Sequence, residues 1–128
     1  MFTFQKKAGG FLSYLRPQIL HMPFIEINEI KGKEVFPGFF GRGIHTGSQT
    51  FMYWTVDKDA TVPQHSHLHE QFAHVIKGSF ELTVGGETAV LEAGKVAFIP
   101  ANIPHSGRAI TNCELLDVFC PEREDYKF

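Results

Sequence analysis

The residues best suited to chemistry are concentrated in a short stretch of histidines. Four of the seven histidines, His65, His67, His69 and His74, lie within ten positions of one another. Alternate side chains of an extended chain share one face, so His65, His67 and His69 are expected to project together. His74 follows Gln71 by three residues and is expected on the opposite face, in a packing or subunit-contact role. Because imidazole binds zinc, nickel, copper, iron and manganese, the cluster indicates a metal site, with a solvated polar loop as the alternative.

A second candidate is a single acid inside an apolar segment. Asp117 lies in the middle of residues 115–119, where an unpaired carboxylate would be costly to desolvate. Strand alternation places Leu115, Asp117 and Phe119 on one face. If that face points inward, Asp117 faces any metal held there. The alternative for Asp117 is a structural ion pair with Arg42 or Arg123.

The opposite face of the same segment carries Leu116 and Val118. An apolar face left open to water invites association, so these residues need cover. The N-terminal segment or a second copy of the chain could provide it. A homodimer is therefore expected.

The elements that must position these residues are short strands. From Phe24 onward, apolar runs alternate with Gly, Pro, Asp or Asn, and no helical periodicity is present. Tight hairpin turns are expected at Lys77–Gly78 and at Gly85–Gly86. The pattern predicts an all-β, single-domain jelly-roll barrel, that is, a double-stranded β-helix. Strands are predicted at residues 24–27, 39–45, 50–56, 71–76, 79–84, 88–92, 96–99, 106–110 and 114–119.

Length and composition limit the classes of protein. The 128 residues are 43% hydrophobic, as expected for one domain with one core. A net charge of -2 disfavours a nucleic-acid partner, and no apolar run is long enough to span a bilayer. Two cysteines, Cys113 and Cys120, are too few for a disulfide scaffold. We expect a cytoplasmic protein with an N-terminal arm of uncertain order over residues 1–21 and a folded domain over 22–128.

Two motifs resemble those of the cupin superfamily. The pattern G-x5-H-x-H-x3,4-E-x6-G falls on His65, His67, Gln71 and Gly78, and G-x5-P-x-G-x2-H-x3-N falls on Gly94, Pro100 and His105. The sequence departs from these motifs at four positions, which hold Asp59, Gln71, Asn102 and Ala109 in place of glycine, glutamate, glycine and asparagine.

The resemblance implies a small barrel, similar to the RmlC-like cupins, that holds one divalent transition metal. The implied ligands are His65, His67, Gln71 and His105, with positions left open to water or substrate. Zinc, nickel, manganese and iron all suit this set, and His69 and Glu70 are rival ligands. Three neutral imidazoles and a neutral amide leave the ion its full charge, which should attract a small anion.

The C-terminal residues resemble those of one particular group of cupins. The segments 65–71 and 116–126 look like those of the pectin-degradation cupins, which convert unsaturated monouronates to linear keto sugars. The resemblance implies that Asp117, Phe119 and Arg123 line the substrate pocket. It implies a metal-dependent, isomerase- or lyase-like enzyme that opens a sugar acid by Lewis-acid and general acid/base chemistry.

Other functions remain open from the sequence. A non-catalytic cupin that binds a small anion and a metal-dependent dioxygenase are the alternatives. Secondary pocket candidates are Arg42, His45, Tyr53 and Trp54, each of which is equally suited to an ordinary place in the barrel or on its surface.

Overall fold

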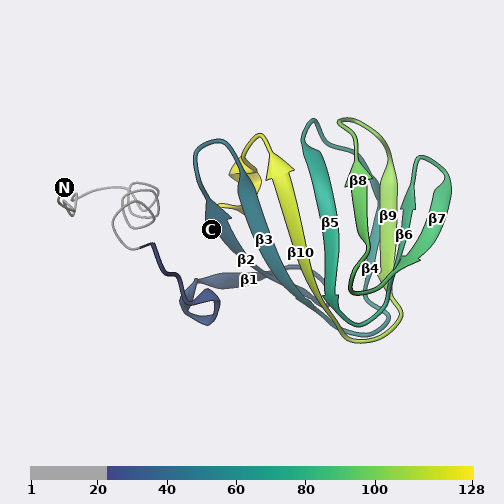
Figure 1. Cartoon of the computed structure of the whole chain (residues 1–128), viewed down its shortest axis with the longest axis horizontal. Helices are drawn as coiled ribbons and strands as arrows, with labels where there is room; N and C mark the ends of the chain where they lie inside the picture. Colours follow the sequence, from purple (N-terminus) through teal and green to yellow (C-terminus); the bar gives the residue numbers. More distant parts are fainter. Residues whose placement is uncertain (1–22) are drawn as a thin grey trace.

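The computed structural model describes residues 23–128, and nearly all of its regular structure is β-strand (Figure 1). The all-β prediction is confirmed. In the described range, the helical elements are two single 3-10 turns, η1 (Ile27–Glu29) and η2 (Glu124–Tyr126), and no helix is long and apolar enough to cross a membrane. The predicted N-terminal arm, residues 1–21, lies outside the described residues. The strands are β1 (Gly32–Phe36), β2 (Phe39–His45), β3 (Thr50–Val56), β4 (Thr61–His65), β5 (Glu70–Lys77), β6 (Phe80–Val84), β7 (Glu87–Leu91), β8 (Val96–Ile99), β9 (His105–Ala109) and β10 (Cys113–Cys120).

The strands form two antiparallel sheets with the core between them. The six-stranded sheet has the order β1-β2-β3-β10-β5-β8 and the four-stranded sheet the order β4-β9-β6-β7 (Figure 1). Alternation sends every second residue of β3 inward, so Met52, Trp54 and Val56 are buried. Phe80 and Leu82 contribute to the same core from the four-stranded sheet. This is the predicted jelly-roll arrangement.

Most predicted strands agree with the structure, and the errors have physical causes. Residues 24–27 were predicted as a strand, but they lead into η1 and expose Phe24 and Ile25, because they have no strand partner. Strands β1 and β4 were not predicted. β4 contains Pro63 and a polar sequence, which a strand tolerates at the edge of a sheet, where β4 lies.

The two glycine turns have different roles. Gly85 and Gly86, with φ of 55° and 89°, connect the paired strands β6 and β7, so this predicted hairpin is confirmed. The hairpin predicted at Lys77–Gly78 is wrong, because β5 belongs to the six-stranded sheet and β6 to the four-stranded sheet. Gly78, with φ of 93°, instead turns the chain from one sheet to the other.

The motif positions that the resemblance assigns to glycine share one backbone conformation. Asp59, Gly78, Gly94 and Asn102 all have positive φ, at 68°, 93°, 96° and 63°. Asp and Asn are the non-glycine residues that adopt the left-handed region most readily. The two substitutions therefore preserve the turns that the motifs require.

We predict that Gly78→Ala destabilises the fold much more than Gly86→Ala. Both glycines have φ near 90°, but a Cβ on Gly78 would overlap the Asn112 carbonyl oxygen, whereas a Cβ on Gly86 meets nothing within 4 Å. Backbone strain alone costs on the order of 1–3 kcal/mol, and the overlap at Gly78 adds to it. Urea unfolding of the two variants measures the difference. Equal losses in the free energy of unfolding would mean that the turn at Gly78 between the two sheets tolerates a side chain.

Candidate metal centre

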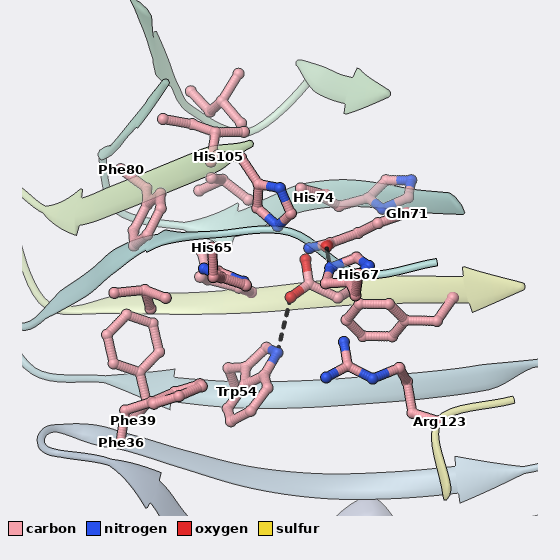
Figure 2. Close-up of a pocket in the computed structure, with 18 of the residues that line it drawn as sticks. Phe36, Phe39, Trp54, His65, His67, Gln71, His74, Phe80, His105 and Arg123 are labelled. Carbon is pink, nitrogen blue, oxygen red and sulfur yellow. Dashed lines mark hydrogen bonds between the residues drawn. The ribbon is translucent and has the colours of Figure 1, made fainter. Parts of the chain in front are cut away.

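Three histidines from two parts of the sequence meet in one cavity. His65 ends β4, His105 begins β9 beside it as its cross-strand partner, and His67 lies in the connection to β5. The ring centroids of His65 and His105 are 4.3 Å apart, and those of His67 and His105 are 4.8 Å apart (Figure 2). One ring nitrogen of each histidine lies within 4.8 Å of the other two. The geometry brings together the three predicted histidine ligands.

Backbone carbonyl groups fix the orientation of all three rings. Nδ1 of His65 donates to the Pro63 carbonyl at 2.8 Å, and Nδ1 of His105 donates to the Ile103 carbonyl at 2.8 Å. Nδ1 of His67 donates to the carbonyl of His69 at 3.0 Å. Because Nδ1 carries the proton in each neutral ring, each Nε2 presents a lone pair. Metal-binding histidines are commonly oriented in this way.

The donor set fits a cation. Among the described residues, the buried Nε2 of His105 has no hydrogen-bond partner, which is unfavourable for a buried polar atom. Oε1 of Gln71 lies 3.1 Å from Nε2 of His67, although both atoms are acceptors once Nδ1 holds the proton. A cation bound between these lone pairs would convert both features into ligand bonds. His65, His67, Gln71 and His105 would hold it.

Burial favours the neutral form of two of the proposed ligand imidazoles, His67 and His105. Desolvation, followed by the positive charge of Arg123, lowers the pKa of His67 to about 4. Desolvation also lowers the pKa of His105, although its hydrogen bond to the Ile103 backbone opposes the shift. Neutral rings at physiological pH are the form that binds a metal.

Asp117 on β10 faces the interior beside this cluster. Its Oδ2 accepts a hydrogen bond from Nε1 of Trp54 at 2.9 Å, drawn as the dashed line in Figure 2. Burial raises the pKa of Asp117 to about 6, against hydrogen bonds from Gln71 and Trp54 that favour the charged form. The alternative ion pair with Arg42 or Arg123 is not formed among the described residues. Asp125 is the carboxylate partner of Arg123, and Nε of Arg42 donates to the Ile30 carbonyl.

Arg123 lies at the edge of the same cavity with its guanidinium held on three sides. Its Nε and Nη2 donate to the two carboxylate oxygens of Asp125 at 2.9 and 2.7 Å. Its guanidinium carbon lies 4.7 Å from the Phe119 ring centroid and 4.1 Å from that of Tyr126. The backbone N–H of Arg123 donates to Thr50 Oγ1, which ties this turn to β3. The guanidinium is thus held in place for recognition of an anion.

The cavity joins the polar cluster to an aromatic wall. Its lining includes the four proposed ligands as well as Asp117, Phe119 and Arg123, so the seven predicted site residues meet in one cavity. Of the four secondary candidates, Trp54 alone lines it, and His45 instead bonds Thr50 and the Tyr126 carbonyl. Sequence reasoning missed Tyr126, whose position next to the Arg123 segment was the available signal. The apolar part of the lining comprises Phe36, Phe39, Val62, Ala73, Val75, Phe80, Leu82, Leu91 and Leu115.

The rival ligands lie outside the cluster of three rings. His69 contacts the Phe119 ring at 6.4 Å between centroids, and Glu70 is exposed on β5. Nδ1 of His74 donates to the Leu116 carbonyl of the neighbouring strand at 3.1 Å, so its ring bonds the sheet backbone. The ring of His69 lies 5.5 Å from that of His67, but His69 is not one of the three residues whose ring nitrogens lie within 4.8 Å of one another. Of the three histidines expected to project together, His65 and His67 belong to that group.

We predict that His105→Ala weakens binding of a divalent ion such as Zn²⁺ or Co²⁺ by at least about 100-fold. Ion binding at such sites is worth on the order of 10 kcal/mol shared among the ligands, and this variant removes one ligand. His69→Ala is the matched control and should leave the affinity within a few-fold. Competition against a chelating dye measures both. A larger loss of metal affinity in His69→Ala than in His105→Ala would mean that His69, and not His105, is a ligand.

Two known proteins are similar in sequence to about half of the chain. The chain is 34% identical over 71 residues to the pectin degradation protein KdgF of Dickeya dadantii, and 30% identical over 69 residues to an uncharacterized protein of Streptomyces coelicolor. These matches cover 54% and 53% of the chain, and they span 64% and 66% of the two relatives, slightly less than two thirds of each.

Solved structures extend the likeness to most of the fold. KdgF from a Halomonas species superposes with a TM-score of 0.75 at 28% identity, covering 80% of this chain and 96% of that one. An RmlC-like cupin from Shewanella frigidimarina gives 0.76 at 28% identity, covering 80% and 94%. Residues 52–119, which include all four proposed metal ligands, match the Cupin domain family. The chain belongs to the cupin family.

Proposed function

We propose that this cupin is a metal-dependent enzyme that converts a 4,5-unsaturated monouronate to its linear keto form. The observation that carries the proposal is that three converging Nε2 atoms, Asp117 and Arg123 line one cavity. The similarity to pectin degradation proteins supports the same class of substrate. A bound zinc, nickel, manganese or iron ion would supply Lewis acidity toward a substrate oxygen.

Arg123 and Phe119 are proposed to bind and orient the sugar acid. Asp125 occupies Nε and Nη2 of Arg123, which leaves the Nη1 N–H groups to donate to the substrate carboxylate. Phe119 is buried beside the guanidinium and offers an apolar surface to the sugar ring. The carboxylate and the sugar ring of the substrate are therefore held in a fixed position relative to Asp117.

Asp117 is proposed to move the proton. Its carboxylate accepts the proton of the hydroxyl on the hemiacetal carbon as the bond from that carbon to the ring oxygen breaks. The products of this step are an aldehyde and an enolate, and Asp117 then gives its proton to the carbon of the enolate double bond, which leaves a ketone and restores the carboxylate. The reaction is an isomerisation, so it consumes no oxidant and no further reactant.

We predict that Asp117→Asn lowers turnover by at least about 100-fold, since general acid/base groups contribute roughly 10²–10⁴-fold. Loss of the ultraviolet absorbance of an unsaturated monouronate measures the rate, and elemental analysis at saturating metal should give the wild-type metal content. Asp59→Asn makes the same carboxylate-to-amide change at an exposed residue outside the lining of the cavity and is the matched control.

Two results would contradict the proposal. Metal-loaded protein that leaves the absorbance at its spontaneous rate would exclude this reaction, and a bound uronate would then indicate a binding protein. Oxygen uptake with a candidate substrate would indicate a dioxygenase.

We also propose that two copies of the chain pair through the outer face of the six-stranded sheet. Four large apolar side chains lie exposed there on the adjacent strands β5 and β8: Phe72, Ile76, Val96 and Phe98 are 45%, 52%, 51% and 46% exposed. Phe72 and Phe98 are cross-strand partners with ring centroids 5.0 Å apart. A patch of this kind favours association, and a two-fold axis would bury it against itself.

We predict that wild-type protein sediments as a dimer at micromolar concentration and that Phe98→Lys sediments as a monomer, because a buried lysine charge opposes the interface. Val90→Lys places the same charge at a similarly exposed residue of the other sheet and should remain dimeric. A monomeric wild-type protein, or dissociation by Val90→Lys alone, would contradict this assembly.

A further inference from the structure

Asp117 connects an indole of the core to one of the proposed metal ligands. Its Oδ2 accepts from Nε1 of Trp54 at 2.9 Å, and the Gln71 side chain lines the same cavity and favours the charged form of the carboxylate. Oε1 of that amide lies 3.1 Å from Nε2 of His67. In Figure 2, the dashed hydrogen bond runs from Trp54 toward the side on which Gln71 and His67 lie.

The Gln71 amide has two ends, and only one of them can bind a cation. With Nδ1 of His67 donating to a backbone carbonyl, the Nε2 of His67 is an acceptor. In isolation, this acceptor would favour the NH₂ group of Gln71. A carboxylate accepts hydrogen bonds and donates none when ionised, so Asp117 draws the NH₂ group to itself and turns the amide oxygen toward the histidines.

Trp54 fixes the orientation of the Asp117 carboxylate. Its indole N–H can only donate a hydrogen bond, so Asp117 is always the acceptor in this pair. Trp54 is 5% exposed, and edge-to-face contacts with Phe39 and Tyr126, at 6.0 and 5.7 Å between ring centroids, fix its plane. The carboxylate orientation is therefore set by the aromatic core.

We propose that Trp54 is a positioning residue for the metal site, acting through Asp117 to keep the oxygen of the Gln71 amide directed at the three histidines. The inference deepens the proposed function, because it requires that the cluster bind a metal, but it does not require the uronate reaction. Groups that orient metal ligands typically change metal affinity by 10–100-fold.

The test is Co²⁺ binding by the full chain, measured as affinity and as the visible absorption spectrum. Trp54→Phe keeps an aromatic ring and removes the N–H. We expect Co²⁺ affinity to fall about tenfold and the spectrum to shift as the Gln71 oxygen leaves the ion. Phe39→Leu removes one of the ring contacts that hold the indole but keeps the N–H donor, so it should change both quantities less than Trp54→Phe does.

A double-mutant cycle with Gln71→Ala separates positioning from general destabilisation. If Trp54 acts through Gln71, Trp54→Phe should have no further effect on Co²⁺ affinity once Gln71 is alanine. If Trp54→Phe does not fold, Asp117→Asn tests the same connection, because its single acceptor oxygen satisfies one of the two donors. That variant should also lose about tenfold in affinity and still fill at saturating metal.

Three results would overturn the inference: wild-type protein that binds no Co²⁺, an effect of Trp54→Phe no larger than that of Phe39→Leu, or additive effects in the cycle. Wild-type protein that binds Co²⁺ with the expected variant effects, yet leaves the uronate unchanged, would remove the proposed enzyme activity and support the positioning role.

Discussion

Three short hydrogen bonds from histidine side chains to the backbone determine what this site can do. Each joins an Nδ1 to a carbonyl two residues away and thereby holds one ring of the cluster with its Nε2 directed at the others. Without them the rings could rotate or exchange tautomers, and the lone pairs would not converge. The cupin barrel supplies the rest, because β4 and β9 place His65 and His105 side by side although forty residues separate them in the sequence.

The site combines groups of different polarity in one enclosed space. Neutral imidazoles and an amide leave the charge of a bound ion uncompensated, and Arg123 adds a second positive centre. Asp117 is the acid placed between them and the aromatic wall. A small anion with an apolar ring face matches this distribution. The fold itself is shared with proteins of several activities, so the proposed chemistry depends on these side chains and not on the barrel.

Much of the fold and site could be read from the sequence because the signals are local. Strict alternation identified β3 and the inward face of β10 with Asp117 on it, and motif spacing predicted the four proposed ligands, which line one cavity in the structure. Other features depend on tertiary partners that the sequence does not display. β4 is stabilised by pairing with β9 despite its proline, the turn at Gly78 connects two sheets, and His105 from β9, not the nearby His69, completes the group of three histidines. The Trp54–Asp117 hydrogen bond joins residues 63 positions apart, and no periodicity reveals it.

The most direct measurement is an anomalous-difference map from crystals of the metal-loaded protein. We expect one strong peak per chain, about 2.0–2.2 Å from Nε2 of His65, His67 and His105 and from the side-chain oxygen of Gln71. A peak bound to Nδ1 atoms, or one coordinated by His69 or Glu70 with His105 turned away, would contradict this expectation.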